Sequence, residues 1–413
     1  MAKLRAGVGA GARPARGLLR LLVALMLLVA ATAGCTGGDP ARFVPPEPSP
    51  TPTVPPPTVA LTPTDGATDA LISTEIGIET DGEISTVALS DESGDQVDGW
   101  LREDGSSWVP DRPLDPDTEY TATVTVANDA GLTATAQTSF TTMAAPSART
   151  GTGLYLFDGN QYGVAMPVVV EFLQPVPEEY RAEVQKRMFV NTEPAQPGVW
   201  HWVGDGRQAF YRAPEYWQPG TTIDVRIALE GHPTGDGLYG DQDRSATVTI
   251  GRKLEMKVDN ASKEMEVYQD GELLRTIPVS LGKPSTPSSY GNMVVMSKER
   301  ETVFDTFDEL GPEEGYRVDI EYAMRLTWGG EYIHAAPWSV ADQGVRNVSH
   351  GCVNMSMENA AWLFERALIG DPVQVSGTER ALAHGNGWTA WNLSWEEFVQ
   401  GSALPVPDEL ANP

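Results

Sequence analysis

The sequence predicts a mainly β protein in which two tandem immunoglobulin-like β-sandwiches precede a third, β-rich domain with a few helices and a tryptophan-rich C-terminal segment. Three observations predict this fold class. Apolar and polar residues alternate along many short segments, Asp-Gly and similar turn signals separate these segments, and the order of segments recurs at an offset of about a hundred residues. The chain has 413 residues, which is enough for two to four domains at about 100–200 residues each.

Residues 1–35 are predicted to be an export signal. Residues 1–20 are basic and contain no acidic residue. The apolar run at residues 21–31 is too short for a membrane span, which needs about 20 residues. Small residues precede Cys35 and resemble a bacterial lipobox, which predicts lipidation of Cys35 and a membrane anchor outside the cytoplasm. The alternative is an ordinary signal peptide or short anchor in which Cys35 is incidental.

Residues 36–58 are predicted to be a proline-rich linker. Nine prolines occur within residues 40–57, and such a segment favours extended polyproline geometry at about 3.1 Å per residue. It would hold the following domains away from the membrane. Plain disorder would serve almost the same purpose.

Residues 59–146 and 147–251 are predicted to be the two immunoglobulin-like domains. Residues 121–126 alternate with period two, and a segment rich in proline and aromatic residues precedes this strand. A similar segment precedes the strand expected at residues 223–229. We expect a spacing role for both domains, since no residue pattern indicates that they bind wall polymer.

Residues 252–377 are predicted to form the β-rich third domain. Its first part has the pattern of an antiparallel meander, residues 332–335 and 372–375 are expected to be strands, and a helix is expected from the cap Ser356 to Ile369. Residues 378–413 are a C-terminal extension expected to pack back on this domain. Its aromatic residues include Trp388, Trp391, Trp395 and Phe398.

Composition excludes several classes of function. The formal net charge of −28 makes the chain a poor ligand for nucleic acid, whose affinity comes mostly from Lys and Arg. Two cysteines, Cys35 and Cys352, exclude a disulfide framework, and five histidines are too few for an elaborate metal site. No glycine-rich phosphate loop is evident, so neither a cofactor nor a metal is expected.

The residues that indicate chemistry are His334 and the run Ser-His-Gly-Cys-Val-Asn from Ser349 to Asn354. Cys352 is a candidate nucleophile, which needs either a lowered pKa or a neighbouring base. Spacing alone leaves both His334 and His350 open as that base. Backbone N–H groups around Gly351 could bind an oxyanion. The alternatives are a buried structural cysteine with a core histidine, or a metal ligand whose site lacks further members.

This pattern resembles the signature of the L,D-transpeptidase (YkuD-type) family, in which a histidine is followed after a spacer by Ser/Thr-His-Gly-Cys-x-Asn. Further segments resemble the multidomain, lipid-anchored branch with two immunoglobulin-like domains, and the resemblance covers nearly all of residues 59–405. These segments are Tyr162-Gly-Val-Ala-Met-Pro, Tyr216-Trp, Gly315-Tyr316-Arg317, Ala336-Pro-Trp-Ser and Gly370-Asp-Pro-Val.

The resemblance implies an acyltransferase that acts on peptidoglycan stem peptides. Cys352 would attack the carbonyl that joins the third residue, a diamino acid, to the D-Ala of a tetrapeptide donor. D-Ala would leave, a thioester would form, and the side-chain amine of another stem would then take the acyl group to give a 3→3 cross-link. The resemblance makes His334 the general base, oriented by the backbone carbonyl of Ala335. It also implies acylation of Cys352 by carbapenem β-lactams.

The resemblance assigns the remaining site residues. His350, Gly351 and Cys352 would form the oxyanion hole, and Asn354 would hold the substrate or the loop. Tyr316 corresponds to a lid tyrosine that lines the donor pocket. Ser349, Ala335 and Trp338 complete the expected substrate-binding set.

Two questions stay open at this level. Residues 301–315 are strongly acidic and are either a solvated loop or a surface that attracts the cationic acceptor amine. The site residues would serve equally for an L,D-carboxypeptidase, in which water replaces the amine, or for a transferase that uses another amine. An inactive wall-binding spacer lipoprotein is a further alternative.

Overall fold

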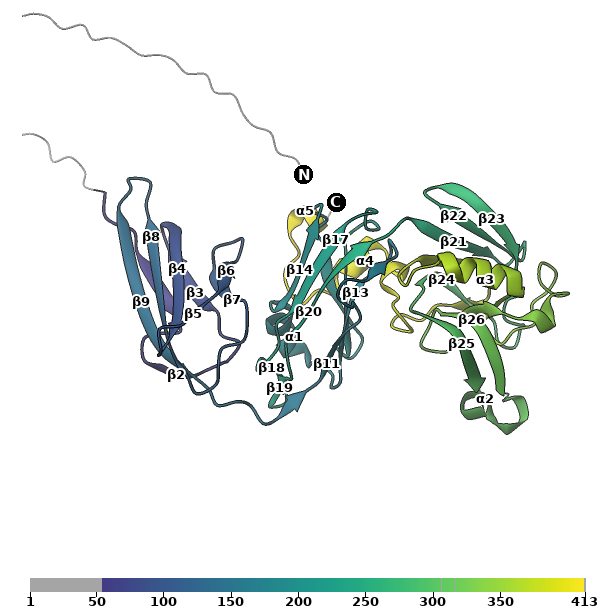
Figure 1. Cartoon of the computed structure of the whole chain (residues 1–413), viewed down its shortest axis with the longest axis horizontal. Helices are drawn as coiled ribbons and strands as arrows, with labels where there is room; N and C mark the ends of the chain where they lie inside the picture. Colours follow the sequence, from purple (N-terminus) through teal and green to yellow (C-terminus); the bar gives the residue numbers. More distant parts are fainter. Residues whose placement is uncertain (1–53, 306, 316, 412–413) are drawn as a thin grey trace, which may run out of the picture. The chain divides into compact units, whose positions relative to one another are not determined.

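The computed structural model describes residues 54–305, 307–315 and 317–411. The export signal, Cys35, most of the linker and Tyr316 therefore lie outside the described residues. Within the described part of the chain, no helix is long and apolar enough to cross a membrane. The predicted fold class is confirmed, since the structure is mainly β with few helices (Figure 1).

Two facing sheets form the first sandwich. One sheet has the order β1 (Val59–Thr62), β3 (Ile76–Thr80), β7 (Ser107–Pro110), β6 (Gly99–Leu101). The other has the order β2 (Ala67–Ala70), β9 (Thr133–Thr142), β8 (Glu119–Ala127), β4 (Glu83–Asp91), β5 (Gln96–Val97). In β8 the side chains of Tyr120, Ala122, Val124 and Val126 are buried and alternate with more exposed residues. The predicted alternation at residues 121–126 is thus confirmed.

Strands between residues 149 and 250 form three further sheets. Their orders are β10 (Arg149–Thr150), β19 (Leu238–Gly240), β18 (Pro233–Gly235); β11 (Thr152–Leu154), β13 (Val168–Phe172), β16 (Gln208–Arg212), β15 (Val199–Val203); and β12 (Gln161–Tyr162), β20 (Arg244–Ile250), β17 (Thr222–Ile227), β14 (Met188–Glu193). A short helix, α1 (Glu178–Gln185), interrupts the strands and was not predicted. Its apolar residues recur at every second position, at Tyr180, Ala182 and Val184, which is the spacing of a strand.

The third domain contains two sheets with α3 (Met357–Arg366) packed against both (Figure 1). The six-stranded sheet has the order β23 (Glu272–Pro278), β22 (Glu264–Gln269), β21 (Leu254–Asp259), β29 (Pro372–Ser376), β24 (Ser289–Val294), β30 (Arg380–Ala381). The four-stranded sheet has the order β25 (Ser297–Asp305), β26 (Arg317–Arg325), β27 (Tyr332–Ala335), β28 (Val353–Met355). The strands expected at residues 332–335 and 372–375 are therefore present.

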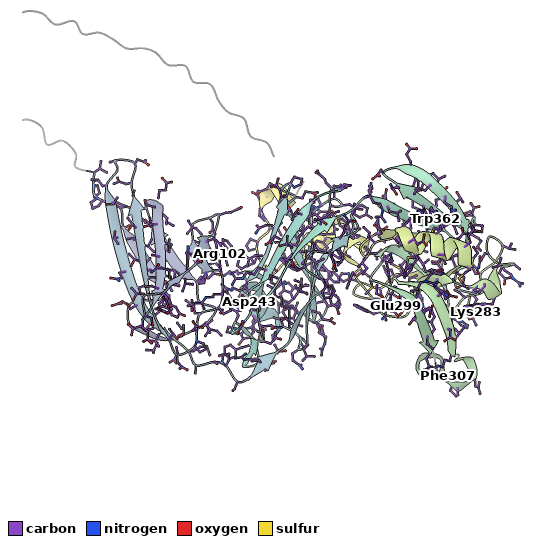
Figure 2. The ribbon with its side chains drawn as sticks, viewed as in Figure 1. Arg102, Asp243, Lys283, Glu299, Phe307 and Trp362 are labelled. Atoms are coloured by element: carbon purple, nitrogen blue, oxygen red, sulfur yellow. The ribbon has the colours of Figure 1, made fainter. Side chains whose placement is uncertain are left out.

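The β25–β26 hairpin carries the acidic segment at its tip. The short helical segment α2 (Phe307–Glu314) joins the two strands, and Figure 2 shows Phe307 at this end of the hairpin. At the base of the tip, Arg317 forms an exposed ion pair with Asp305 at 3.1 Å. Asp305, one of the acidic residues of segment 301–315, is therefore paired with a cation of the same hairpin.

Helix α3 begins where the sequence predicts and ends earlier. The Ser356 hydroxyl accepts a hydrogen bond from the Asn359 N–H, as an N-cap does. The expected end was Ile369, but the backbone is already extended at Ala367. Side chains take over the hydrogen bonds of the last turn: Lys298 Nζ donates to the Ala367 carbonyl, and Asp371 accepts from the Leu368 N–H at 2.7 Å.

The C-terminal extension contacts two domains. It comprises β30, the 3-10 helix η2 (Ala390–Asn392), α4 (Trp395–Val399) and α5 (Asp408–Ala411). Strand β30 pairs with β24 of the third domain, whereas Trp388 and Phe398 are buried in one core with strands of the second sandwich. The same core contains Val294 and Met296 of the third domain, and Asn292 donates to the Trp391 carbonyl at 3.2 Å. The extension therefore packs on the third domain and also on the second sandwich.

Candidate active site

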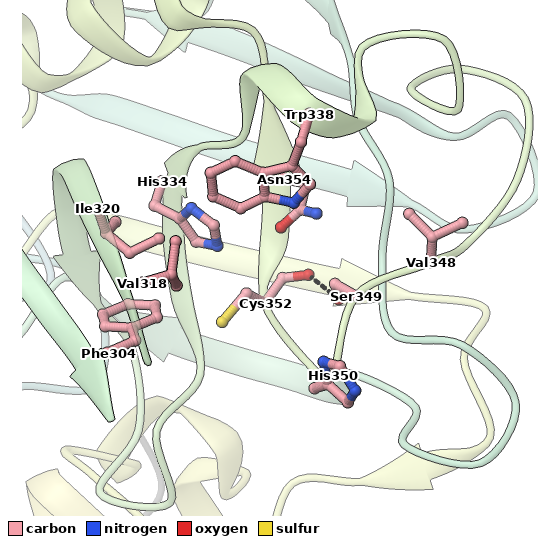
Figure 3. Close-up of a pocket in the computed structure, with 10 residues that line it drawn as sticks. All are labelled: Phe304, Val318, Ile320, His334, Trp338, Val348, Ser349, His350, Cys352 and Asn354. Atoms are coloured by element: carbon pink, nitrogen blue, oxygen red, sulfur yellow. Dashed lines mark hydrogen bonds between the residues drawn. The ribbon is translucent and has the colours of Figure 1, made fainter. Parts of the chain in front are cut away.

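Parallel pairing of β27 with β28 brings the two sequence-distant parts of the motif together. The register places Ile333 opposite Val353 and His334 opposite Asn354, so that Cys352 directly precedes the paired segment. His334 and Cys352 both line one cavity of about 350 Å³ (Figure 3). Long-range strand pairing therefore creates a proximity that the spacing of the residues did not determine.

The His334 ring is held in one tautomer. Its side chain is 3% exposed, and Nδ1 lies 2.8 Å from the Ala335 carbonyl oxygen. A carbonyl can only accept, so Nδ1 carries the proton and Nε2 keeps its lone pair. Burial lowers the pKa of His334 to about 4, so the ring is neutral at pH 7. His334 is therefore a neutral imidazole that can accept a proton, and Ala335 has the predicted backbone role.

Aromatic rings flank His334 on two sides. The Phe304 ring is 5.4 Å from the imidazole, edge to face, and the Trp338 ring is 6.1 Å away. Trp338 itself is 58% exposed and forms part of the cavity wall. These contacts restrict rotation of the imidazole, and they keep it in a low-dielectric environment in which the neutral form is favoured.

The Cys352 thiol is buried and protonated. It is 8% exposed, and Sγ lies 3.7 Å from the Gly330 carbonyl oxygen, to which it can donate. Burial raises the pKa of Cys352 to about 12, a backbone hydrogen bond from Tyr332 opposes this rise, and the charge of Glu331 adds to it. A thiol in this state needs a base when it attacks, and His334 faces the same cavity.

Side-chain hydroxyls shape the turn that carries Cys352. Ser349 Oγ donates to the Cys352 carbonyl at 2.6 Å and accepts from the Gly351 N–H at 3.1 Å (Figure 3). Gly351 has φ +133°, a conformation that strongly favours glycine. Ser349 was predicted to bind substrate, and here its hydroxyl holds the turn. The Gly351 N–H, a predicted oxyanion donor, is engaged by this hydroxyl.

The contacts of His350 make it a poorer base than His334. Lys283 Nζ lies 3.1 Å from His350 Nε2. Because an ammonium can only donate, Nε2 of His350 acts as the acceptor. This contact engages the lone pair with which Nε2 would have to accept a proton as a general base. The geometry therefore favours His334 among the two histidines that the sequence left open.

Asn354 presents an unpaired acceptor to the cavity. Its Nδ2 donates to Ser339 Oγ at 3.3 Å, while its Oδ1 is buried and has no hydrogen-bond partner. A buried polar atom without a partner costs about 1–3 kcal/mol, and a ligand N–H could satisfy it. Asn354 therefore has an acceptor that a ligand could use, and its expected role in holding the substrate or the loop stays a prediction.

Four apolar residues of the cavity wall were not predicted: Phe304, Val318, Ile320 and Val348. Phe304 lies opposite Val318 in the β25–β26 register, and Ile320 points to the same side as Val318. A sequence signal was present for Val318 and Ile320 only, since these two residues alternate with charged residues along β26. Among the residues that the structure describes, no cluster of three or more His, Cys, Asp and Glu is placed to hold a metal ion.

Comparison with known proteins decides the family. Residues 255–375 match the model of the L,D-transpeptidase catalytic domain, and residues 67–233 match that of a bacterial Ig domain. L,D-transpeptidase 5 of Mycobacterium tuberculosis is 35% identical over 368 residues, which cover 86% of this chain and 79% of that protein. The chain belongs to the L,D-transpeptidase family.

A second relative agrees with this L,D-transpeptidase assignment. L,D-transpeptidase 2 of Mycobacterium tuberculosis is 30% identical over 388 residues, which cover 93% of this chain and 94% of that protein. A solved L,D-transpeptidase in complex with imipenem covers 56% of this chain and all of that chain, at 35% identity and a TM-score of 0.47. L,D-transpeptidases are acyltransferases, and a thiol beside a neutral imidazole suits acyl transfer.

Proposed function

We propose that this L,D-transpeptidase forms 3→3 cross-links between peptidoglycan stem peptides through a thioester on Cys352. The observation that carries the proposal is the shared cavity of a protonated Cys352 and a neutral His334 whose Nδ1–H is held by Ala335. In this state the proton can move from Sγ to Nε2 as the sulfur attacks.

The first half-reaction acylates the enzyme. Cys352 Sγ forms a bond to the carbonyl carbon of the third stem residue, and His334 Nε2 takes the thiol proton. The tetrahedral intermediate then collapses, the C–N bond to D-Ala breaks, and the imidazolium returns its proton to the leaving amine. The products are free D-Ala and a thioester.

The second half-reaction transfers the acyl group. The side-chain amine of a diamino acid in another stem attacks the thioester, and His334 takes one of its protons. The C–S bond breaks and the thiol is restored by the same proton. No energy-rich cofactor is needed, because one amide bond replaces another.

Two features of the cavity suit a peptide donor. The unpaired Asn354 Oδ1 can accept from an amide N–H, and apolar side chains such as Val318 and Ile320 can contact the methylene chain of a diamino acid. The same thiol would open a carbapenem ring by attack on its strained carbonyl and remain acylated. We therefore propose carbapenems as covalent inhibitors.

We further propose that the protein is exported and anchored by lipid on Cys35. The support is the order of residues 1–35, in which a basic segment and an apolar run precede small residues and the cysteine. Mass spectrometry of the membrane fraction tests this, because lipidation adds the mass of acyl chains to an N-terminal Cys35 and Cys35→Ser removes them. An unmodified Cys35 would contradict the anchor.

Mass spectrometry of reaction products tests the activity. The chain and its Cys352→Ala variant are incubated with purified disaccharide-tetrapeptide. Dimers that lack one D-Ala and arise only with the unsubstituted enzyme support 3→3 cross-linking. Tripeptide monomers without dimers would instead indicate an L,D-carboxypeptidase, and adducts only with an added foreign amine would indicate a different acyl acceptor. The absence of any product and of any acyl-enzyme would favour a wall-binding spacer.

A further inference from the structure

A buried carboxylate, that of Glu331, lies next to the backbone that contacts the candidate nucleophile. Glu331 is 5% exposed and stands between Gly330 and Tyr332 in sequence. The Gly330 carbonyl and the Tyr332 N–H are the two backbone groups that contact Cys352 Sγ. The position of Glu331 therefore sets the position of the backbone on both sides of the sulfur.

Residues on two strands of the six-stranded sheet hold this carboxylate, and one of the two strands, β30, belongs to the C-terminal extension. Ser289 on β24 donates to it from its N–H at 3.2 Å and from its hydroxyl at 2.9 Å. Arg380 on β30 forms an ion pair with it. The β24–β30 register pairs Ser289 with Arg380, so both partners reach Glu331 from adjacent positions.

The ion pair also lies against the turn before Cys352. A Cβ built on Gly351 would lie 3.5 Å from Glu331 Cγ and 3.7 Å from Arg380 Nη2, which is ordinary contact distance. The Glu331 side chain is 7% exposed, whereas that of Arg380 is 47% exposed. Arg380 thus connects the buried carboxylate to solvent at the edge of the active-site turn.

We propose that Glu331 and Arg380 are a charge-compensated pair of positioning residues that holds the Gly330–Tyr332 backbone and the Gly351 turn around Cys352. This inference rests on the proposed function, in which Cys352 is the nucleophile. Neither residue is among those that line the cavity shared by Cys352 and His334. Each acts through the backbone and through its charge near the sulfur.

The charge of each member has an opposite effect on the thiol. The charged and titratable side chains around the site are Glu331, Arg380, Lys283, His334 and His350. Burial is the main cause of the raised pKa of Cys352, and the negative charge of Glu331 adds to it. Arg380 compensates that charge, so its removal leaves a buried carboxylate facing the thiol.

The alkylation rate of Cys352 tests the pair. The full chain is treated with iodoacetamide between pH 7 and pH 9, and the Cys352 peptide is followed by mass spectrometry. Because only the thiolate reacts, a shift of about one pKa unit changes the rate about tenfold. Glu331→Gln should raise the rate about tenfold and Arg380→Gln should lower it by a similar factor.

Further variants separate this effect from damage to the fold. Unfolding exposes the thiol and accelerates alkylation, so a slower Arg380→Gln variant cannot result from unfolding. The double variant removes both opposing charges and should react at close to the parent rate. Glu331→Asp keeps the charge and should also stay close to the parent rate. Glu75→Gln is the matched control, since Glu75 pairs with Arg187 in a partly buried ion pair between residues of the two sandwiches and should leave the rate unchanged.

The outcomes distinguish this inference from the proposed function. Rates that change in the same direction in both single variants, or by less than about twofold, would overturn the positioning pair. Alkylation needs no substrate, so it reports on the pair even if no cross-linked product forms. Opposite shifts without any product would support the pair and reject the proposed function.

Discussion

The hydrogen bond from His334 Nδ1 to the Ala335 carbonyl determines what the imidazole can do. It fixes the proton on one nitrogen and leaves the other with its lone pair in the cavity. The role needs only a backbone carbonyl, so alanine at position 335 serves as well as a hydroxyl residue would. His334 can therefore act as a base because of its own imidazole and the backbone carbonyl of Ala335.

Substitution of the two reacting groups should remove activity to different degrees. Cys352→Ala should give no product, because no other thiol lines the cavity. His334→Ala should lower the rate about 10²–10⁴-fold, the usual contribution of a general base. His350→Ala should cost less, because Lys283 engages the lone pair of its Nε2. Quantified cross-linked dimer measures all three, and full activity of Cys352→Ala would disprove the nucleophile.

The pH profile should reflect the lowered pKa of His334. The base must be neutral to act, and burial lowers its pKa to about 4, whereas an ordinary histidine titrates near 6.5. As the pH falls from 7 to 5, kcat/KM should therefore stay nearly constant, and it should fall only as the pH approaches about 4. Initial rates across this range check the profile, and a midpoint near 6.5 would show that the ring is not buried during turnover.

Asn354 should contribute to substrate recognition through Oδ1. Asn354→Ala removes a buried acceptor that a substrate N–H would satisfy, and we expect kcat/KM to fall about tenfold, or about 1.4 kcal/mol. Ser339→Ala is the matched control, because it removes the partner of Nδ2, together with the hydroxyl's bonds to Ala336 and Gln343, and leaves Oδ1 in place. Equal losses in both variants would mean that Asn354 acts by holding the loop.

At the scale of elements, the sequence predicted what depends on local pattern. Strand β27 lies at Tyr332–Ala335 as expected, because aromatic and β-branched residues such as Tyr332 and Ile333 favour strands. Helix α1 was missed because its apolar residues have strand spacing, although Pro177 and two following acids mark a helix start. The end of α3 was misplaced because Lys298 and Asp371 come from outside the helix.

The residues of the candidate site also differ in whether the sequence alone could identify them. The motif residues could be named from their order in the chain, since thiol and imidazole chemistry is readable from residue type. Phe304 and Arg380 could not be identified from the sequence, because strand pairing between separate segments of the chain brings them to the site. Glu331 and Arg380 are 49 positions apart, and only the β24–β30 pairing brings them together.

The N-cap of α3 should have a measurable effect on stability. Ser356→Ala removes the acceptor for the Asn359 N–H and should lower the free energy of unfolding by about 1 kcal/mol. Ser356→Asp should retain most of the stability, because a carboxylate accepts the same bond and suits a helix N-terminus. Urea denaturation compares the variants, and an unchanged midpoint for Ser356→Ala would contradict the capping role.

At the scale of the whole described chain, Arg212 ties the C-terminal extension to the second sandwich. Its guanidinium lies 4.4 Å from the ring centres of Trp391 and Phe398 and donates to the carbonyls of Ala390 and Leu393. Burial lowers the pKa of Arg212 to about 10, so the side chain stays charged at pH 7. One cation therefore stacks on aromatic rings and caps two backbone carbonyls of the extension.

Loss of this cation should loosen the extension. Arg212→Met leaves two carbonyls without their donor and removes the cation–π contacts, so the free energy of unfolding should fall by about 2–4 kcal/mol. Arg207→Met, at an exposed ion pair with Asp205, is the control and should change it by less than about 1 kcal/mol. Thermal unfolding monitored by tryptophan fluorescence measures both, and equal changes would contradict the tie.

The burial of Cys352 also governs how long the enzyme survives between turnovers. With the pKa of the thiol raised to about 12, the resting enzyme carries a neutral thiol at pH 7. Peroxides oxidise the thiolate and not the thiol, so conversion to sulfenic acid should be slow at this residue. For a protein proposed to work outside the cell, where no glutathione pool restores a lost thiol, a sulfur that stays protonated in the resting enzyme is chemically durable.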